Sequence, residues 1–430
     1  MGLTTEPTTR ETRRPLNRWP FSFAPSRLNP WRGLSGLPRE VWLLFATNLI
    51  NRAGMMVLPF LVLYLTRERA FTPGQAGLGL ALYGAAAIVA GPLSGWLSDR
   101  IGALPIMRAS LLMSGAAVLA FPLARSRAAI YAMTILWAGC AELFRPASLA
   151  AITHVVSSDQ RKPAYALNRL AINIGMSIGP ALGGFLAAVS FRAMFVVDAG
   201  TTIVAGLVLC LTSWAGPTRG YVEENEALYH GEAKSLLRDT RLLIFLIASV
   251  LVGIVFYQHE SALPLYLVEY LSQSTAFYGT LFTINTLLIV ALEVPLNGAT
   301  AHWPNSWALF AGCMLFAIGF GALAIVSSPG GVLITVVVWT FGEMMLFPAM
   351  AAHLGEIAPR NKRGAYMGAY SMSLAVALAF GPWIGTQLLA SVGPVAVWSV
   401  MFALGALAAG LMVYGGSHRR ETGAVIAAGS

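Results

Sequence analysis

Two ionisable side chains stand in the middle of long apolar runs. Arg52 follows Asn48 and Asn51 in the first run, and Glu343 lies about halfway along a later one. An ionised group at the centre of a bilayer costs about 2.5–3.5 kcal/mol on insertion scales, so each is a functional candidate. Asn48 and Arg52 are one helical turn apart and share a face. We expect Arg52 to hold an anionic group or a carboxylate, and Glu343 to carry a proton or a cationic substrate. A buried packing role is the alternative for both.

Four further charges lie nearer to the ends of their runs. Glu142 and Arg145 are three residues apart, so on a helix they share a face and can neutralise each other. Arg169 lies in the following run, and Asp99 lies at the edge of an earlier one. We interpret these residues as a cytoplasmic gate network with a structural role rather than a substrate-binding one.

Patterns for metal binding and catalysis are incomplete. His259-Glu260 is half of the zinc-protease pattern HExxH, but residue 263 is leucine, so we predict no metal site. The sequence has neither a GxSxG elbow nor a phosphate-binding loop, which argues against serine hydrolysis and ATP-driven transport. We predict no catalytic residue, no enzyme activity and no cofactor, and we expect His259 to be packed or pore-lining.

The amino-acid composition indicates that most of the chain faces something other than water. Of the 430 residues, 57% are hydrophobic and 11% are charged, whereas a soluble chain carries about 25% charged residues. Apolar runs of about 20 residues have the length of a helix that crosses a bilayer. This excludes a secreted enzyme, a nucleic-acid-binding domain and a disordered protein. The three cysteines form no CxxC pair, so neither a disulfide framework nor a zinc site is expected.

The fold class predicted is an all-α integral membrane protein with twelve transmembrane helices. Clusters of Pro and Gly separate the apolar runs, as expected for loops. The predicted spans are 41–65, 74–97, 103–124, 128–150, 164–188, 193–214, 242–267, 276–298, 307–327, 331–354, 365–389 and 394–415.

Basic residues in the loops orient the chain. With the N-terminus in the cytoplasm, nineteen of the 28 Lys and Arg residues fall in cytoplasmic segments, as the positive-inside rule requires. We therefore expect an inner (plasma) membrane protein with both termini in the cytoplasm. The domains predicted are a tail that touches anionic lipid (1–39), a six-helix bundle (40–214), a linker (215–241), a second six-helix bundle (242–416) and a C-terminal tail (417–430).

The two halves of the chain resemble each other. A shift of 202 positions places spans four and five over spans ten and eleven without a gap, and Leu58-Pro59 near span one matches Leu263-Pro264 near span seven. Such a repeat predicts two bundles around a central cavity, with the substrate near the midplane. The pairs matched by the shift are Trp137 with Trp339, Pro146 with Pro348, Arg161 with Arg363, Gly179-Pro180 with Gly381-Pro382, and Gly183 with Gly385.

The turn between spans two and three reads Gly-Trp-Leu-Ser-Asp-Arg-Ile-Gly, from Gly95 through Asp99 and Arg100 to Gly102. Asp99 could accept hydrogen bonds from a neighbouring helix N-terminus, and rocking of the bundles would break them. The turn resembles the G-x-L-x-D-R-x-G signature of major facilitator transporters, although Ala-Leu-Pro replaces the basic pair that usually follows. This resemblance implies the major facilitator fold.

Span five carries Gly175, Gly179, Pro180, Gly183 and Gly184. Glycines four apart let another helix approach closely. The series resembles the G-x-x-x-G-P-x-x-G-G motif of the drug:proton antiporter branch, which implies export. Plain helix packing is the alternative. An arginine usual in span four of that branch is absent here.

Span seven contains Tyr257, Gln258 and His259 before Leu263-Pro264, an arrangement similar to span seven of bacterial drug exporters in this superfamily. The resemblance implies that these residues line the substrate cavity. Aromatic and Met residues suit promiscuous apolar ligands, and they also suit ordinary packing. The candidates are Met55, Met56, Tyr83, Trp137, Phe256, Tyr257, Trp339, Met344, Met345 and Trp383.

These features predict a secondary transporter that exports small amphipathic compounds in exchange for protons. The expected partners are a small-molecule substrate, protons and membrane lipids but no nucleic acid, and the expected state is a monomer whose energy source is the proton gradient. One alternative is proton-coupled uptake of a nutrient such as a peptide or sugar. Asn48 and Asn51, however, replace both carboxylates of the E-x-x-E-R motif that oligopeptide transporters carry there. A non-transporting membrane enzyme or scaffold is the alternative from another class.

Overall fold

A computed structural model describes residues 36–157, 160–214, 238–300, 302–359 and 363–427, with side chains up to residue 414 apart from those of residues 162, 363 and 364. Within these ranges the regular elements are all helical and no strand is present. Twelve helices or helix pairs are long and apolar enough to cross a membrane, which confirms the predicted fold class. Their ends differ from the predicted ones by only a few residues. The predicted tail and linker lie almost entirely outside the described residues.

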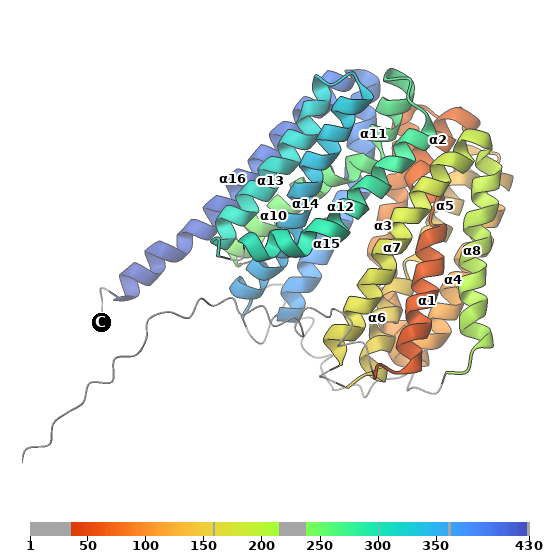
Figure 1. The fold of residues 1–430 in the computed structure, drawn as a ribbon, viewed down its shortest axis with the longest axis horizontal. Coiled ribbons are helices and arrows are strands. Elements are labelled where there is room, and N and C mark those ends of the chain that lie inside the picture. The colour runs from red at the N-terminus through yellow and green to blue at the C-terminus, as the bar shows by residue number, and fades with distance from the viewer. Residues whose placement is uncertain (1–35, 158–159, 215–237, 301, 360–362, 428–430) are drawn as a thin grey trace, which may run out of the picture. The chain divides into compact units, whose positions relative to one another are not determined.

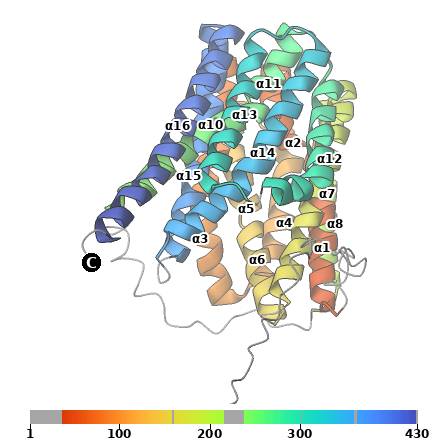
Figure 2. The same cartoon turned by 60° about the vertical axis from the view of Figure 1, so that its left-hand side comes forward.

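The helices form two groups that are visible in Figures 1 and 2. The first group comprises α1 (Arg39–Gly54), α2 (Val57–Arg69), α3 (Pro73–Ile101), α4 (Ala103–Ala120), α5 (Arg127–Ala141), α6 (Phe144–Val155), α7 (Arg161–Val189) and α8 (Phe191–Leu211). The second comprises α10 (Thr240–Phe256), η4 (Tyr257–Glu260), α11 (Ala262–Leu265), η5 (Tyr266–Tyr270), α12 (Thr275–Thr300), α13 (Asn305–Gly321), α14 (Pro329–Ile357), α15 (Arg363–Ser391) and α16 (Pro394–Ala427).

Short polar motifs start several of these helices. Thr72 and Gln75 form a capping box at the start of α3, with Pro73 as its first residue. The hydroxyl of Ser126 caps α5, and that of Ser328 caps α14. Each cap gives a hydrogen-bond acceptor to a backbone N–H that has no partner inside the helix.

Three of the twelve spans are interrupted. The first span breaks at Met55 and Met56 between α1 and α2, and the fourth breaks between α5 and α6. The seventh changes at Tyr257 from an α-helix to the short 3₁₀ segment η4, followed by α11 and η5. Interrupted helices in membrane proteins typically line a cavity or a protein interior rather than face lipid.

The two groups meet along α7 with α12 and along α3 with α15. A Cβ added at Gly184 would lie 2.6 Å from the carbonyl oxygen of Thr275 and 3.1 Å from the Cα of Gly279. The Thr275 hydroxyl donates to the Gly184 carbonyl at 2.9 Å. The absence of side chains at Gly184 and Gly279 therefore lets the backbones of α7 and α12 come into direct contact.

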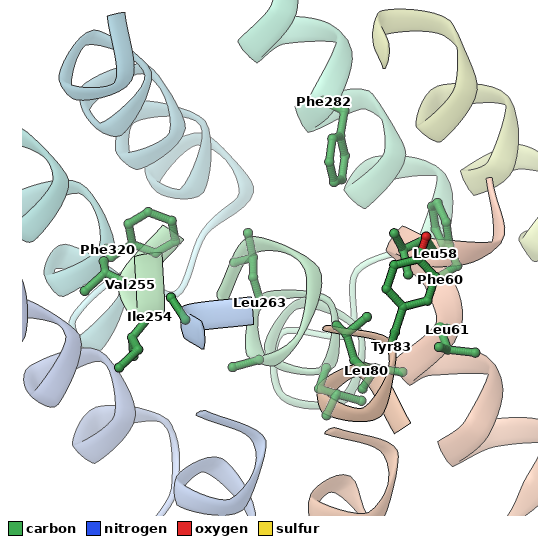
Figure 3. Packing of buried hydrophobic residues seen from close by; sticks show 14 of the residues in the cluster. Leu58, Phe60, Leu61, Leu80, Tyr83, Ile254, Val255, Leu263, Phe282 and Phe320 are labelled. Atoms are coloured by element: carbon green, nitrogen blue, oxygen red, sulfur yellow. The ribbon is translucent and has the colours of Figure 1, made fainter. Parts of the chain in front are cut away.

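Burial is concentrated at the end of the molecule that holds α2 and α11 (Figure 1). Every residue from 57 to 65 and from 258 to 268 is buried, whereas no residue of α12 after Thr286 is. Figure 3 shows Leu263 of α11 between the core of the second group and the side chains of Leu58 and Tyr83. The two groups are thus packed together at this end and less closely at the end where α1 begins.

We predict that Gly184→Ala lowers the stability of the protein. Its Cβ would meet backbone atoms of α12 that cannot rotate away, and such overpacking costs about 1–3 kcal/mol. Gly139→Ala is the matched control, because no heavy atom lies within 4 Å of its added Cβ. Thermal unfolding in detergent micelles should show a lower melting temperature for Gly184→Ala alone, and equal melting curves for the two variants would contradict the close contact.

Candidate functional site

A cavity of about 150 Å³ lies between α7 and the second group of helices. We call it the Glu343 cavity. Helices α7, α10, α12 and α14, together with η4 and α11, contribute its walls. The lining residues are Asn173, Met176, Phe256, His259, Leu263, Tyr278, Leu281, Phe282, Asn285, Thr286, Ile289, Trp339 and Glu343.

The carboxylate of Glu343 is held by one amide. Asn285 Nδ2 of α12 donates to Glu343 Oε2 at 2.9 Å and lies 3.0 Å from the hydroxyl oxygen of Thr340. No described arginine, lysine or histidine lies within ion-pair distance of Glu343. A carboxylate in mainly apolar surroundings is neutralised either by a proton or by a cationic ligand. The geometry therefore offers one acidic group that can hold either a proton or a cation. The sequence did not predict Asn285 as its hydrogen-bond partner.

Aromatic rings form much of the wall of this cavity. The His259 ring centroid lies 4.5 Å from that of Phe256, 5.5 Å from Phe282 and 6.3 Å from Trp339. Flat ring faces attract organic cations and adapt to ligands of different shape. This cavity thus combines one carboxylate with several aromatic faces.

The three residues predicted in span seven are placed differently. His259 lines the cavity, its Nδ1 lies 2.6 Å from the Phe256 carbonyl oxygen, and its Nε2 lies 3.6 Å from Glu260 Oε1. Gln258 Nε2 donates to the carbonyls of Ile254 and Gly381 at 2.8 and 2.9 Å. Gln258 therefore joins the broken span to α15, and Tyr257 is not among the residues that line the cavity.

Arg52 lies in a different cavity, of about 40 Å³, inside the first group of helices. We call it the Arg52 cavity, and its polar lining consists of Asn51, Arg52, Tyr83, Ser114, Glu142, Asp198 and Thr202. Arg52 Nη1 contacts Met55 Sδ at 3.0 Å, and the buried Nε finds no acceptor among the described residues. Asn48 instead donates to Asn168 Oδ1 at 2.9 Å. Arg52 and Glu343 are thus distributed between two cavities.

The predicted gate residues do not form one network in this conformation. Glu142 accepts a hydrogen bond from Tyr83 at 2.9 Å and forms no ion pair with Arg145. The two ion pairs within the described part of the chain are His259–Glu260 and Arg169–Glu293. Arg169 of α7 reaches Glu293 of α12 at 2.6 Å, with 65% and 17% of their side chains exposed. This pair and Glu343 line a further cavity of about 80 Å³.

The turn from Gly95 to Gly102, which contains the predicted gate residue Asp99, is largely exposed. The Arg100 guanidinium lies 4.1 Å from the ring centroid of Trp96, and both Asp99 and Arg100 are solvent-exposed. Gly102 has φ +96° between α3 and α4, a conformation that suits glycine because it has no Cβ. A Cβ at Gly95 would meet no atom within 4 Å, so the structure gives this glycine no packing role.

The glycines of span five support the break in span one. An added Cβ would lie 2.4 Å from Arg52 Cβ at Gly175 and 2.7 Å from the Arg52 carbonyl oxygen at Gly179. At Gly183 it would lie 3.0 Å from Met56 Cβ. The motif therefore lets α7 pack directly against the end of α1 and the start of α2.

Sequence reasoning also missed a role for Asp198 of α8. Its Oδ2 accepts hydrogen bonds from the backbone N–H groups of Met56 and Val57, at 2.9 and 2.8 Å. A carboxylate inside an apolar run was a visible signal, but the sequence could not show which helix end it faces.

Comparisons with known proteins agree with this architecture. The chain is 26% identical over 366 residues to a Na(+), Li(+), K(+)/H(+) antiporter of Planococcus maritimus, covering 77% of this chain and 85% of that protein. It is 24% identical over 339 residues to the multidrug resistance protein MdtH of Aeromonas salmonicida, covering 78% and 84%. The crystal structure of a POT family transporter in complex with 5-aminolevulinic acid has the same fold, with a TM-score of 0.76 at 14% identity over 90% of this chain and 97% of that one.

The model of the Major Facilitator Superfamily matches residues 43–272 and 261–426, which together span nearly all of the helical part. With twelve spanning helices, an internal repeat and a cavity between the two halves, the chain belongs to the major facilitator superfamily of secondary transporters.

Proposed function

We propose that this transporter exports small amphipathic cations in exchange for protons, with the Glu343 cavity as the shared binding site. The single observation that carries the proposal is a carboxylate that no described cationic side chain neutralises, set in an aromatic cavity between the two halves. The relatives named as a multidrug resistance protein and as a cation/proton antiporter support export and exchange.

Exchange follows from competition for one acidic group. If Glu343 binds either a proton or a cationic substrate, then arrival of one releases the other. The aromatic faces of Phe256, Phe282 and Trp339 would stabilise an organic cation beside the carboxylate. Asn285 keeps the carboxylate oriented in either state.

The distribution of basic residues supports an inner-membrane location with both termini in the cytoplasm. In that orientation the packed end with α2 and α11 is the external side. The structure then corresponds to an inward-facing state, and the Arg169–Glu293 pair lies between Glu343 and the cytoplasm. Substrate entering from the cytoplasm would pass this pair before it reached Glu343.

Exchange of inorganic cations is a second candidate, favoured by the Na(+), Li(+), K(+)/H(+) antiporter among the relatives. Glu343 Oε2 and the Thr340 hydroxyl, both on α14, place two oxygen atoms beside the Asn285 amide nitrogen of α12, and oxygen is the ligand that hard cations prefer. One transport assay with both classes of compound separates the two candidates.

We predict that Glu343→Gln abolishes substrate-dependent proton release. Glutamine keeps the shape and an acceptor for Asn285 but can neither release a proton nor neutralise a cation. The assay uses inverted vesicles with an acidic lumen, a pH-sensitive dye, lipophilic cations, neutral drugs, small metabolites, Na⁺, Li⁺ and K⁺. Glu356→Gln, on the same helix and bonded to Asn305 at 2.7 Å, is the control and should respond like the wild type. Unchanged proton release in Glu343→Gln would refute the assignment.

We also predict that Phe282→Leu raises the KM for flat organic cations about fivefold, because a cation–ring contact contributes ~1 kcal/mol. Phe320→Leu is the matched control, since Phe320 is buried and stacks on Trp339 without lining the cavity. The KM for any inorganic cation should be the same in both variants. An equal increase in KM for organic cations in the two variants would instead indicate a general loss of packing.

A further inference from the structure

Asp198 is a buried carboxylate whose partners are backbone amides. Its residue is 4% exposed, and no described arginine, lysine or histidine lies within ion-pair distance. Oδ2 accepts from the N–H groups of Met56 and Val57, the residues at which α2 begins. A helix N-terminus carries partial positive charge, and hydrogen bonds to a charged acceptor are about twice as strong as neutral ones. Asp198 therefore caps α2 from another span.

The break in span one makes this cap necessary. Helix α1 ends at Gly54, and the chain leaves helical geometry at Met55, with ψ 86°. The next two N–H groups consequently have no partner within the helix. An unsatisfied backbone group in a bilayer costs several kcal/mol. Thr202, one turn further along α8, lies 3.5 Å from the other carboxylate oxygen and so makes at most a weak contact with Asp198.

The first turn of α2 also contacts the opposite half of the molecule. The Tyr278 hydroxyl of α12 lies 3.1 Å from the Pro59 carbonyl oxygen and 2.9 Å from that of His259, so its one proton is shared between the two acceptors. The rings of Phe60 and Tyr278 pack edge to face, with centroids 5.0 Å apart. We call the group Pro59, His259 and Tyr278 the Tyr278 latch. It joins spans one and seven at the packed end of the molecule.

We propose that Asp198 is a positioning residue for transport: by capping α2 it holds Pro59 against Tyr278 and so keeps the packed end closed. The inference rests on the alternating-access function of the superfamily, and it is independent of the substrate and of the role of Glu343. Loss of the cap frees the first turn of α2, and the closed state loses the latch bond to Pro59.

Distance measurements between spin labels test this proposal. Labels would be attached at Glu68 and Ser272, exposed residues near the ends of α2 and η5, after replacement of the three native cysteines. In lipid nanodiscs, Asp198→Ala should raise the ratio of open to closed distances about tenfold, since loss of a cap costs about 1–2 kcal/mol. Asp198→Asn, which keeps an acceptor without charge, should raise it about threefold. Thr202→Val leaves both backbone bonds in place and should match the wild type.

A double-mutant cycle tests whether the cap and the latch act on the same closure. Tyr278→Phe removes the latch hydroxyl and should itself raise the open population. Adding Asp198→Asn should then change that population less than it does alone, because effects on a shared element are not additive. Full additivity would overturn the proposed connection.

Measurements of substrate binding distinguish a positioning role of Asp198 from direct contact between Asp198 and the substrate. Asp198 does not line the Glu343 cavity, so the affinity for tetraphenylphosphonium in the closed population should be the same in Asp198→Asn as in the wild type. Unchanged distances in Asp198→Asn together with weaker binding of this probe would overturn the proposal and make Asp198 a binding residue. Because the distances are measured without substrate, failure of the proposed export function would leave this result intact.

Discussion

Backbone amide and carbonyl groups inside a bilayer cannot bond to water, so each break in a spanning helix needs partners from neighbouring helices. In span one the partner is the Asp198 carboxylate, which accepts from two N–H groups of α2. In span seven the Tyr278 hydroxyl of α12 lies within bonding distance of the His259 carbonyl, and the Gln258 side chain donates to the Ile254 carbonyl of its own span. The same Gln258 amide also donates to the Gly381 carbonyl and so ties span seven to α15. Helices α8 and α12 thus each supply a side chain that bonds to backbone groups at a break.

The breaks in spans one and seven each occur directly before the same dipeptide of the internal repeat. Leu58-Pro59 lies in the first turn of α2, and Leu263-Pro264 lies in α11. Proline is tolerated in a first helical turn because the N–H it lacks would have no partner there. The duplicated halves thus keep the position of the break, but the backbone groups at the break find different partners in each half. A carboxylate caps the first break, and short 3₁₀ and π segments follow the second.

The sequence predicted the twelve spans and singled out Glu343 as a charge in mid-span, because hydrophobic length and a charge inside an apolar run are properties of single helices. A role for Glu343 in transport stays a prediction. The sequence did not predict that Arg52 and Glu343 line separate cavities, since this depends on how each helix is rotated about its axis. Asn285 was not predicted, because a single amide in an apolar helix has no distinctive spacing. The glycines of span five were recognised as a close-packing face, but only the structure identified Arg52 and Met56 as the residues they contact.

Tyr278 lies both at the Glu343 cavity and at the contact between the two halves. Its side chain lines the Glu343 cavity, and its hydroxyl lies within bonding distance of Pro59 in the other half. A ligand shifts a conformational equilibrium only if it binds the two states differently. A compound large enough to displace Tyr278 would have this property, because it would occupy the cavity at the expense of the latch bond. An ion held by the oxygens around Glu343 would not need to move that ring. Under the proposed function, the position of Tyr278 would link ligand size to the opening of the packed end, whereas the charge at Glu343 would select the ligands that bind.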